Sequence, residues 1–267
     1  KRQIHRSIIL CLPMLEKFMK LTLIGNGFVG NAVNKLLQDQ YEIKIVDPKY
    51  NDNVITDDAD GYIVCVPTPE SNTGACDMSI VYDVIKQCPD DTPILIKSTI
   101  SLEGWEMIKT FKKSITFSPE FLTAANAVED FKKQKYMLFG GQDVEYWQDI
   151  FILCKGFTPM VGTIPELILT KYLRNSFLAT KVAFFNEVFD FCENTGLSYD
   201  KIAEMVGIDD RITPSHMQVP GPDGERGFGG ACFPKDTKAL LFTGLMFKSP
   251  FSILGKVVES NERIKNG

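Results

Sequence analysis

The sequence predicts an α/β domain followed by an all-helical domain, and three observations point to this order. Short apolar strands alternate with helical segments over residues 19–162. A glycine-rich turn follows the first of these strands. From Pro165 the pattern becomes one continuous helix, and shorter helices follow it. We therefore expect an α/β domain over residues 19–162 and a helical domain over residues 163–267.

The composition is that of an ordinary globular protein. Of 267 residues, 44% are hydrophobic and 24% are charged. A net charge of −5 argues against the basic face that nucleic-acid binding needs, and no stretch has the roughly 18 apolar residues of a membrane span. Seven cysteines form no C-x-x-C pair, which favours a reducing, cytoplasmic setting. The only histidines, His5 and His216, lie outside any cluster with ligand spacing, so no metal site is predicted.

Residues 1–18 combine a basic start with an apolar run, which superficially resembles a signal peptide. The stretch has no clear small-x-small cleavage site. Because a strand is predicted directly after Met19, we interpret residues 1–18 as an extension that does not belong to the fold.

The turn after the first strand carries Gly25, Gly27 and Gly30 in the pattern G-x-G-x-x-G, and a helical run follows. The second strand, residues 42–46, ends at Asp47, about 20 residues beyond the glycines. Strand, turn, helix and terminal acid in this order are typical of a Rossmann-like dinucleotide-binding domain. A tight turn with a surface aspartate is the alternative interpretation.

A dinucleotide in this domain would place its pyrophosphate at the N-terminus of the helix that starts near Gly30, where backbone N–H groups are free. Asp47 would accept a hydrogen bond from a ribose hydroxyl, and its charge would disfavour a 2′-phosphate, so NAD is expected rather than NADP. The cofactor contacts expected here are Gly25, Gly27, Phe28, Val29, Gly30 and Asp47.

Three later strands end in polar or turn residues. They cover residues 62–66, 94–96 and 115–117, and candidates at 136–139 and 157–161 complete the domain near Gly162. In an open parallel sheet the ligand lies at the carboxyl ends of the strands. We therefore expect Thr68, Thr99 and Glu120 to converge on cofactor and substrate, although plain turn chemistry would also explain each of them singly.

The long helix is predicted from Pro165 to a stop at Gly196, with apolar residues on more than one stripe. Since one α/β domain cannot cover all of this surface, we expect a homodimer through this helix. Lys171 and Asn175 stand four residues apart on one face, where they are candidates for holding an oxyanion. A surface pair is the alternative.

A long loop rich in proline and glycine, residues 209–230, leads into a glycine-rich stretch that contains Cys232. Lys235 and Asp236 follow this cysteine, and a nearby lysine charge would favour a thiolate. We interpret Cys232 as an activated nucleophile. An ordinary buried cysteine that precedes a helix is the alternative.

Taken together, these residues resemble the nucleotide-sugar dehydrogenases, most closely those that oxidise UDP-glucose. The matching stretches follow the family's order through most of residues 20–240. They are residues 25–30, 66–69, 97–99, 118–122, 171–181, 210–212 and 227–236.

The resemblance implies NAD-dependent, four-electron oxidation of the C6 hydroxyl of UDP-glucose, through a cysteine thiohemiacetal and thioester, to the UDP-glucuronate used in polysaccharide synthesis. It implies that Cys232 is the nucleophile and that Lys171, Asn175 and Asp236 stabilise the oxyanion and assist proton removal. Glu120 would serve thioester hydrolysis.

The remaining roles implied by the resemblance concern binding. Thr99 would position water or cofactor, and Arg211 would reach the neighbouring subunit's substrate. Further cofactor contacts would come from Val66, Pro67, Thr68, Thr99 and Lys235. Substrate contacts would come from Glu120, Phe121, Leu122, Lys171, Asn175, Arg211, Phe228 and Gly229.

Two departures from the family pattern stand out. Ala124 occupies the position of a second glutamate, and the sequence ends about where a third, nucleotide-binding domain would begin, which we interpret as a short form. The UDP contacts of that domain would then be absent, supplied by the neighbouring subunit, or not required. The alternatives are a dehydrogenase for a UDP-N-acetylhexosamine or GDP-mannose, and a non-catalytic nucleotide-binding dimer.

Overall fold

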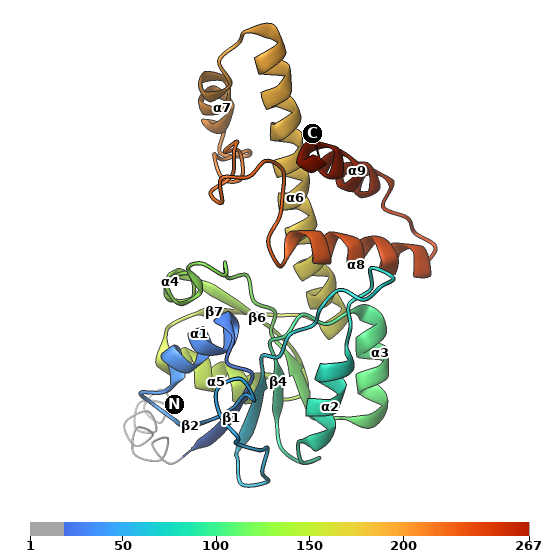
Figure 1. Ribbon diagram of the computed structural model, residues 1–267. Helices are drawn as coiled ribbons and strands as arrows, with labels where there is room; N and C mark the ends of the chain where they lie inside the picture. The colour runs from blue at the N-terminus through green and yellow to red at the C-terminus, as the bar shows by residue number, and fades with distance from the viewer. Residues whose placement is uncertain (1–18, 267) are drawn as a thin grey trace, which may run out of the picture. The chain divides into compact units, whose positions relative to one another are not determined.

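The computed structural model describes residues 19–266, and the extension expected at residues 1–18 lies outside this range. The described chain forms two compact units. A sheet unit comprises residues 19–68 and 77–171, and a helical unit comprises residues 69–76 and 172–266 (Figure 1).

The sheet unit is built on one seven-stranded sheet in the order β2-β1-β3-β4-β5-β6-β7. All four residues of β3 are buried, as expected for a strand that is covered on both faces. The strands are β1 (Lys20–Ile24), β2 (Glu42–Val46), β3 (Gly61–Val64), β4 (Ile94–Ile96), β5 (Ile115–Phe117), β6 (Tyr136–Gly141) and β7 (Thr158–Val161).

The sheet is parallel except at one junction. The pairs from β2 to β5 are parallel, but β6 runs antiparallel to β5, with Thr116 opposite Gly141. Gly141 has φ +129°, and a Cβ there would lie 2.1 Å from the carbonyl oxygen of Ile115. The reversal therefore depends on a glycine, and an apolar run alone does not encode strand direction.

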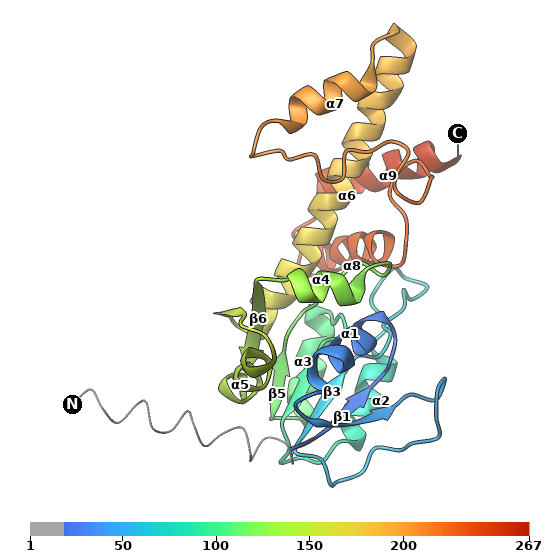
Figure 2. The same cartoon turned by 90° about the vertical axis from the view of Figure 1, so that its left-hand side faces the viewer.

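Five helices of this unit flank the sheet (Figures 1 and 2). Ser101 caps α3 by accepting a hydrogen bond from the N–H of Gly104 at 3.0 Å. Trp147, Phe131 and Phe151 are among the largest fully buried side chains. The helices are α1 (Phe28–Leu37), α2 (Ser79–Gln87), α3 (Leu102–Phe111), α4 (Ala127–Lys133) and α5 (Val144–Cys154).

The helical unit is organised around α6 (Ile164–Thr195), a helix of 32 residues that begins in the sheet unit. α7 (Tyr199–Gly207) lies beside the C-terminal half of α6 in Figures 1 and 2. The ring of Tyr199 contacts that of Phe189, with centroids 5.3 Å apart. Two further helices follow, α8 (Phe233–Met246) and α9 (Ser252–Asn266). The long helix predicted from Pro165 is thus present.

The chain between α7 and α8 forms neither helix nor strand. Lys181 on α6 fixes it by donating to the carbonyls of Ile212 and Thr213 at 2.6 and 2.8 Å. Within residues 19–266, no helix combines the length and apolarity needed to span a membrane.

Candidate active site

The glycines of the turn between β1 and α1 have two different roles: two of them allow close backbone packing, and one leaves space for a ligand. A Cβ on Gly25 would lie 2.6 Å from the carbonyl oxygen of Cys65, and one on Gly30 would lie 2.0 Å from that of Gly25. These two glycines allow the chain to fold tightly. A Cβ on Gly27 would meet nothing within 4 Å, so the turn leaves open space at the helix N-terminus, where a phosphate can approach the backbone.

Asp47 closes this turn from the end of β2. One carboxylate oxygen accepts from the N–H of Asn26 at 2.6 Å, and the other accepts from the N–H of Lys49 at 2.9 Å. The side-chain oxygen of Asn26 is buried and has no hydrogen-bond partner among the described residues. An open helix N-terminus, a fixed carboxylate and an unsatisfied polar atom together suit a dinucleotide.

The other predicted cofactor residues lie after β3 and β4. Val66 and Thr68 are buried, Pro67 is exposed, and Thr99 is half-buried. The hydroxyl of Ser98 donates to the carbonyl of Val66 at 2.8 Å and joins the two strand ends. In the turn itself, Phe28 is exposed and Val29 is half-buried.

Glu120 follows β5 and is almost completely buried. Its Oε1 contacts Nζ of Lys97, which lies at the end of β4. Nζ of Lys171 donates to the backbone carbonyl of Glu120 and lies 5.5 Å from the ring centroid of Phe121. Leu122 packs in the core of the sheet unit. The sequence indicated Glu120 and Lys171 as candidates, but it did not single out Lys97 as a partner of the carboxylate.

In the helical unit, Asp236 is buried and both of its oxygens have partners. Oδ2 accepts from Nδ2 of Asn175 at 2.6 Å, and Oδ1 pairs with Nζ of Lys235 at 2.6 Å. Cys232 is half-buried and is the residue that precedes the first turn of α8. The charge of Lys235 is directed to Asp236.

The loop that carries Cys232 is held by two asparagines that the sequence did not single out. Phe228 is buried against Ala179 and Ala183 of α6. Asn261 pairs with the backbone of Phe228 in both directions, at 2.6 and 3.0 Å. Oδ1 of Asn186 accepts from the N–H of Gly227 at 3.0 Å. Phe228 therefore anchors the loop, and the half-buried Gly229 follows it.

Two further loop residues have defined surroundings. Arg211 is exposed and forms a salt bridge with Asp209. The ring of His216 lies 5.7 Å from that of Phe233, centroid to centroid. Burial, with smaller contributions from Lys181 and Arg174, lowers the pKa of His216, so the neutral form is favoured.

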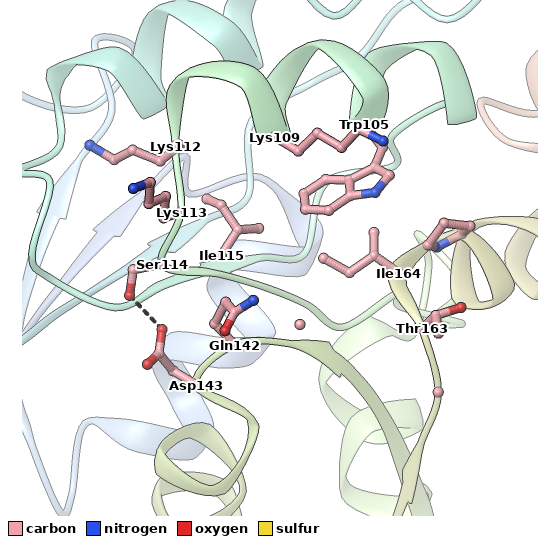
Figure 3. Close-up of a pocket in the computed structure, with 13 residues that line it drawn as sticks. Trp105, Lys109, Lys112, Lys113, Ser114, Ile115, Gln142, Asp143, Thr163 and Ile164 are labelled. Carbon is pink, nitrogen blue, oxygen red and sulfur yellow. Dashed lines mark hydrogen bonds between the residues drawn. The ribbon is translucent and has the colours of Figure 1, made fainter.

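A separate hollow of about 760 Å³ lies where β5 begins and β6 ends, away from the carboxyl ends of β3, β4 and β5 that carry the predicted site residues. Trp105 and Lys109 of α3 border it, together with Gln142 (Figure 3). It contains none of the predicted site residues. We therefore place the candidate chemistry at the glycine-rich turn and at the buried carboxylates. Among residues 19–266, no group of three or more potential metal ligands is placed to hold an ion.

Comparison with known families finds two domains in succession. The NAD-binding domain of the UDP-glucose/GDP-mannose dehydrogenase family matches residues 50–151, and the central domain of that family matches residues 167–263. The first match starts beyond the glycine-rich turn, so the turn is independent evidence for the dinucleotide site.

Similar proteins cover nearly the whole chain. The UDP-glucose 6-dehydrogenase of Rickettsia felis is 34% identical over 301 residues, covering 92% of this chain and 65% of its own length. That of Rickettsia bellii is also 34% identical, covering 91% of this chain and 67% of its own length. A UDP-glucose dehydrogenase structure from Pyrobaculum islandicum has a TM-score of 0.78 at 24% identity, over 94% of this chain and 70% of that one, which supports the fold. The chain spans about two thirds of the length of these proteins.

Proposed function

Because the chain belongs to the UDP-glucose/GDP-mannose dehydrogenase family and carries its NAD-binding domain, we propose that it oxidises UDP-glucose to UDP-glucuronate with two NAD⁺. The observation that carries this proposal is the arrangement at α8, where Cys232 precedes the helix and Asp236 is held by Asn175 and Lys235. The names of the Rickettsia relatives support UDP-glucose as the sugar nucleotide.

Oxidation of an alcohol to a carboxylate removes four electrons, so the aldehyde must be retained between two oxidations. Each bound NAD⁺ supplies a two-electron acceptor. The sulfur of Cys232 attacks the aldehyde carbon to form a thiohemiacetal, whose oxidation gives a thioester. Water then cleaves the C–S bond, which releases the carboxylate and returns the thiol. A covalent cysteine adduct therefore explains why no aldehyde would be released.

Other residues stabilise the negative charge on the substrate oxygen and remove the alcohol proton. Asn175 and Lys171 stabilise negative charge on the substrate oxygen during attack. Asp236 assists removal of the alcohol proton, and its contacts with Asn175 and Lys235 fix its orientation. Lys235 would also contact the cofactor.

The hydrolytic step is assigned to Glu120. In this proposal Glu120 accepts a proton from the attacking water, and Thr99 positions water or cofactor. The family's second glutamate is replaced by Ala124, which is exposed. Glu120 would consequently act without a neighbouring carboxylate at that position.

We propose a homodimer that forms through α6. Four large apolar residues recur along this helix within the helical unit, and each remains well exposed in the single chain. They are Leu173, Phe177, Phe184 and Phe191, with exposed fractions of 43%, 70%, 59% and 62%. A twofold axis would pair this stripe with its copy, and Arg211 would then reach the neighbour's substrate.

The cysteines of the described residues carry no disulfide, which fits a cytoplasmic location.

Stoichiometry tests the proposed reaction. With purified protein and UDP-glucose we expect two NADH per UDP-glucuronate and no free aldehyde, because the adduct retains the intermediate. Cys232→Ser should lose complete turnover and keep NAD binding, since a hydroxyl is a weaker nucleophile than a thiol at neutral pH. Cys154→Ser, at another half-buried cysteine, is the matched control. Carboxylate production by Cys232→Ser at the wild-type rate would remove Cys232 from the mechanism.

The identity of the sugar needs a separate comparison. Values of kcat/KM across UDP-glucose, UDP-N-acetylhexosamines and GDP-mannose would rank the substrates, and a higher value for another nucleotide sugar would replace UDP-glucose. NAD binding measured by calorimetry, with no NADH from any of these compounds, would favour the non-catalytic dimer.

The shared site is tested by subunit mixing. Arg211→Ala and Cys232→Ser chains, each impaired alone, should regain activity when mixed, because hybrid dimers contain one site with both residues intact. Light scattering would follow the mass alongside activity. A fully active monomer would contradict the dimer.

A further inference from the structure

The ammonium group of Lys97 is completely buried next to Glu120. The side chain of Lys97 has an exposed fraction of 0% and that of Glu120 4%, and Nζ contacts Oε1. Nζ also donates to the backbone carbonyl and the hydroxyl of Ser118 at 3.3 and 3.2 Å. These two hydrogen bonds and the ion pair all go to the segment that ends in Glu120.

The surroundings of this pair are apolar. Nζ of Lys97 lies 5.8 and 5.3 Å from the ring centroids of Phe131 and Phe151. The thiol of Cys65 is near enough to interact with Lys97 and Glu120, but burial raises its pKa to about 12, so it is not a counter-ion. Glu120 is therefore the anion that balances Lys97 within the described residues.

Glu120 is held at two points. Lys171 binds its backbone carbonyl and Lys97 binds Oε1, while Oε2 is buried and has no hydrogen-bond partner among the described residues. Lys97 itself is fixed because its N–H donates to the carbonyl of Val64 at 2.9 Å, which joins the ends of β3 and β4. One oxygen is thus paired with a cation, and the other keeps its capacity to accept a proton.

A buried ion pair is a weak source of stability, because desolvation offsets the attraction of the charges. What the pair does provide is a carboxylate whose orientation is fixed at one oxygen. A general base must be in position when water attacks.

We propose that Lys97 is the positioning residue for the hydrolytic half of the reaction, in which it holds Oε1 of Glu120 and so leaves Oε2 to accept a proton. This inference rests on the proposed function. As water attacks the thioester carbonyl, Oε2 takes its proton, the C–S bond breaks, and Cys232 leaves as a thiolate. In this proposal Lys97 acts on the water through Oε1 of Glu120 alone.

The test is a kinetic cycle with Lys97→Met, Glu120→Gln and the double variant. In Lys97→Met, steady-state NADH formation should fall about 100-fold, because general-base catalysis contributes roughly that much or more. The first turnover should still release NADH, and intact mass spectrometry should find the acyl adduct on Cys232. Adding Lys97→Met to Glu120→Gln should slow hydrolysis no further, because Lys97 acts through Glu120.

Lys112→Met is the matched control. Lys112 is also buried, with a side-chain exposed fraction of 2%, and it pairs with Asp90 at 2.8 Å. It lies between α3 and β5, before the strand begins. Its loss should lower the melting temperature but leave hydrolysis unchanged, without an adduct. Should Lys97→Met fail to fold, Ser118→Ala removes one contact of Nζ and should slow hydrolysis several-fold, again with accumulated adduct.

The two hypotheses fail in different ways. If the wild-type enzyme turns over but Lys97→Met and Ser118→Ala accumulate no adduct, or if the effects of Lys97→Met and Glu120→Gln multiply, the role of Lys97 is overturned and the proposed function stands. If the wild-type enzyme forms no cysteine adduct with any nucleotide sugar, the proposed function is overturned, and the role of Lys97 with it.

Discussion

Glu120 in the sheet unit and Asp236 in the helical unit are both buried carboxylates, and their contacts differ. Asp236 uses both oxygens, one toward Asn175 and one toward Lys235. Glu120 uses Oε1 toward Lys97 and leaves Oε2 without a hydrogen-bond partner among the described residues. Both oxygens of Asp236 are thus fixed in direction, whereas Glu120 is fixed at one oxygen only. This difference supports the proposal that Glu120 accepts a proton from the attacking water, while Asp236 assists removal of the alcohol proton in an orientation set by its two partners.

The largest effect expected from this comparison is on stability. Lys97→Met should lower the free energy of unfolding by about 3–5 kcal/mol, because it leaves a buried carboxylate without its cation. Urea unfolding followed by tryptophan fluorescence reports on this change, since Trp105 and Trp147 both lie in the sheet unit. Lys97→Met with Glu120→Gln should recover most of the loss. A double variant less stable than Lys97→Met would contradict the pairing.

The next largest effect is on catalysis, where substitutions of Glu120 and Asp236 should slow different steps. Glu120→Gln should reduce kcat about 100-fold with an acyl adduct on Cys232, because the proton acceptor for water is lost. Asp236→Asn should slow formation of the adduct, so that none accumulates. Rapid-quench mass spectrometry distinguishes the two patterns. An adduct in Asp236→Asn but not in Glu120→Gln would exchange the two assignments.

A smaller effect is expected when Asp236 loses one partner. Asn175→Ala leaves Oδ2 of Asp236 buried without its donor, which should lower the free energy of unfolding by about 1–3 kcal/mol. Far-UV circular dichroism during urea titration measures this change in the helical unit. The control is Asn194→Ala, at an exposed position of the same helix. Its change in stability measures the effect of the higher helix propensity of alanine without loss of a buried contact. Equal values for the two variants would show that the contact with Asp236 contributes nothing.

The smallest effect concerns pH. The pKa of His216 in the folded protein lies below its ordinary value of 6.5, so the unfolded chain binds a proton first as the pH falls. Stability contributed by neutral His216 is therefore present above 6.5 and is lost as the pH falls through the lowered folded pKa. Melting temperatures of the wild-type protein and His216→Gln from about pH 7.5 to about pH 5 should diverge, with the variant less sensitive to acid. Parallel curves would count against this assignment.

The sequence by itself determined the α/β order, the glycine-rich turn and the long helix, because each has a local signature. Gly25 and Gly30 lie where a side chain would collide with backbone, so glycine was required there. α6 extends over Ile164–Thr195, close to the helix predicted from its proline start and glycine stop. Cys232, Asp236 and Glu120 could be singled out as candidates because their motifs are short and contiguous.

Only the tertiary structure decided the rest, because those features join residues distant in the chain. Lys97 and Glu120 are 23 positions apart, and nothing local indicates that a strand-end lysine turns inward to a carboxylate. Asn186 and Asn261 hold the loop of Cys232 from α6 and α9, which a linear pattern cannot reveal. The antiparallel β6 depends on Gly141 meeting Ile115 across the sheet. Partner choice and strand direction are set by packing between elements, and packing is not encoded in the periodicity of any one of them.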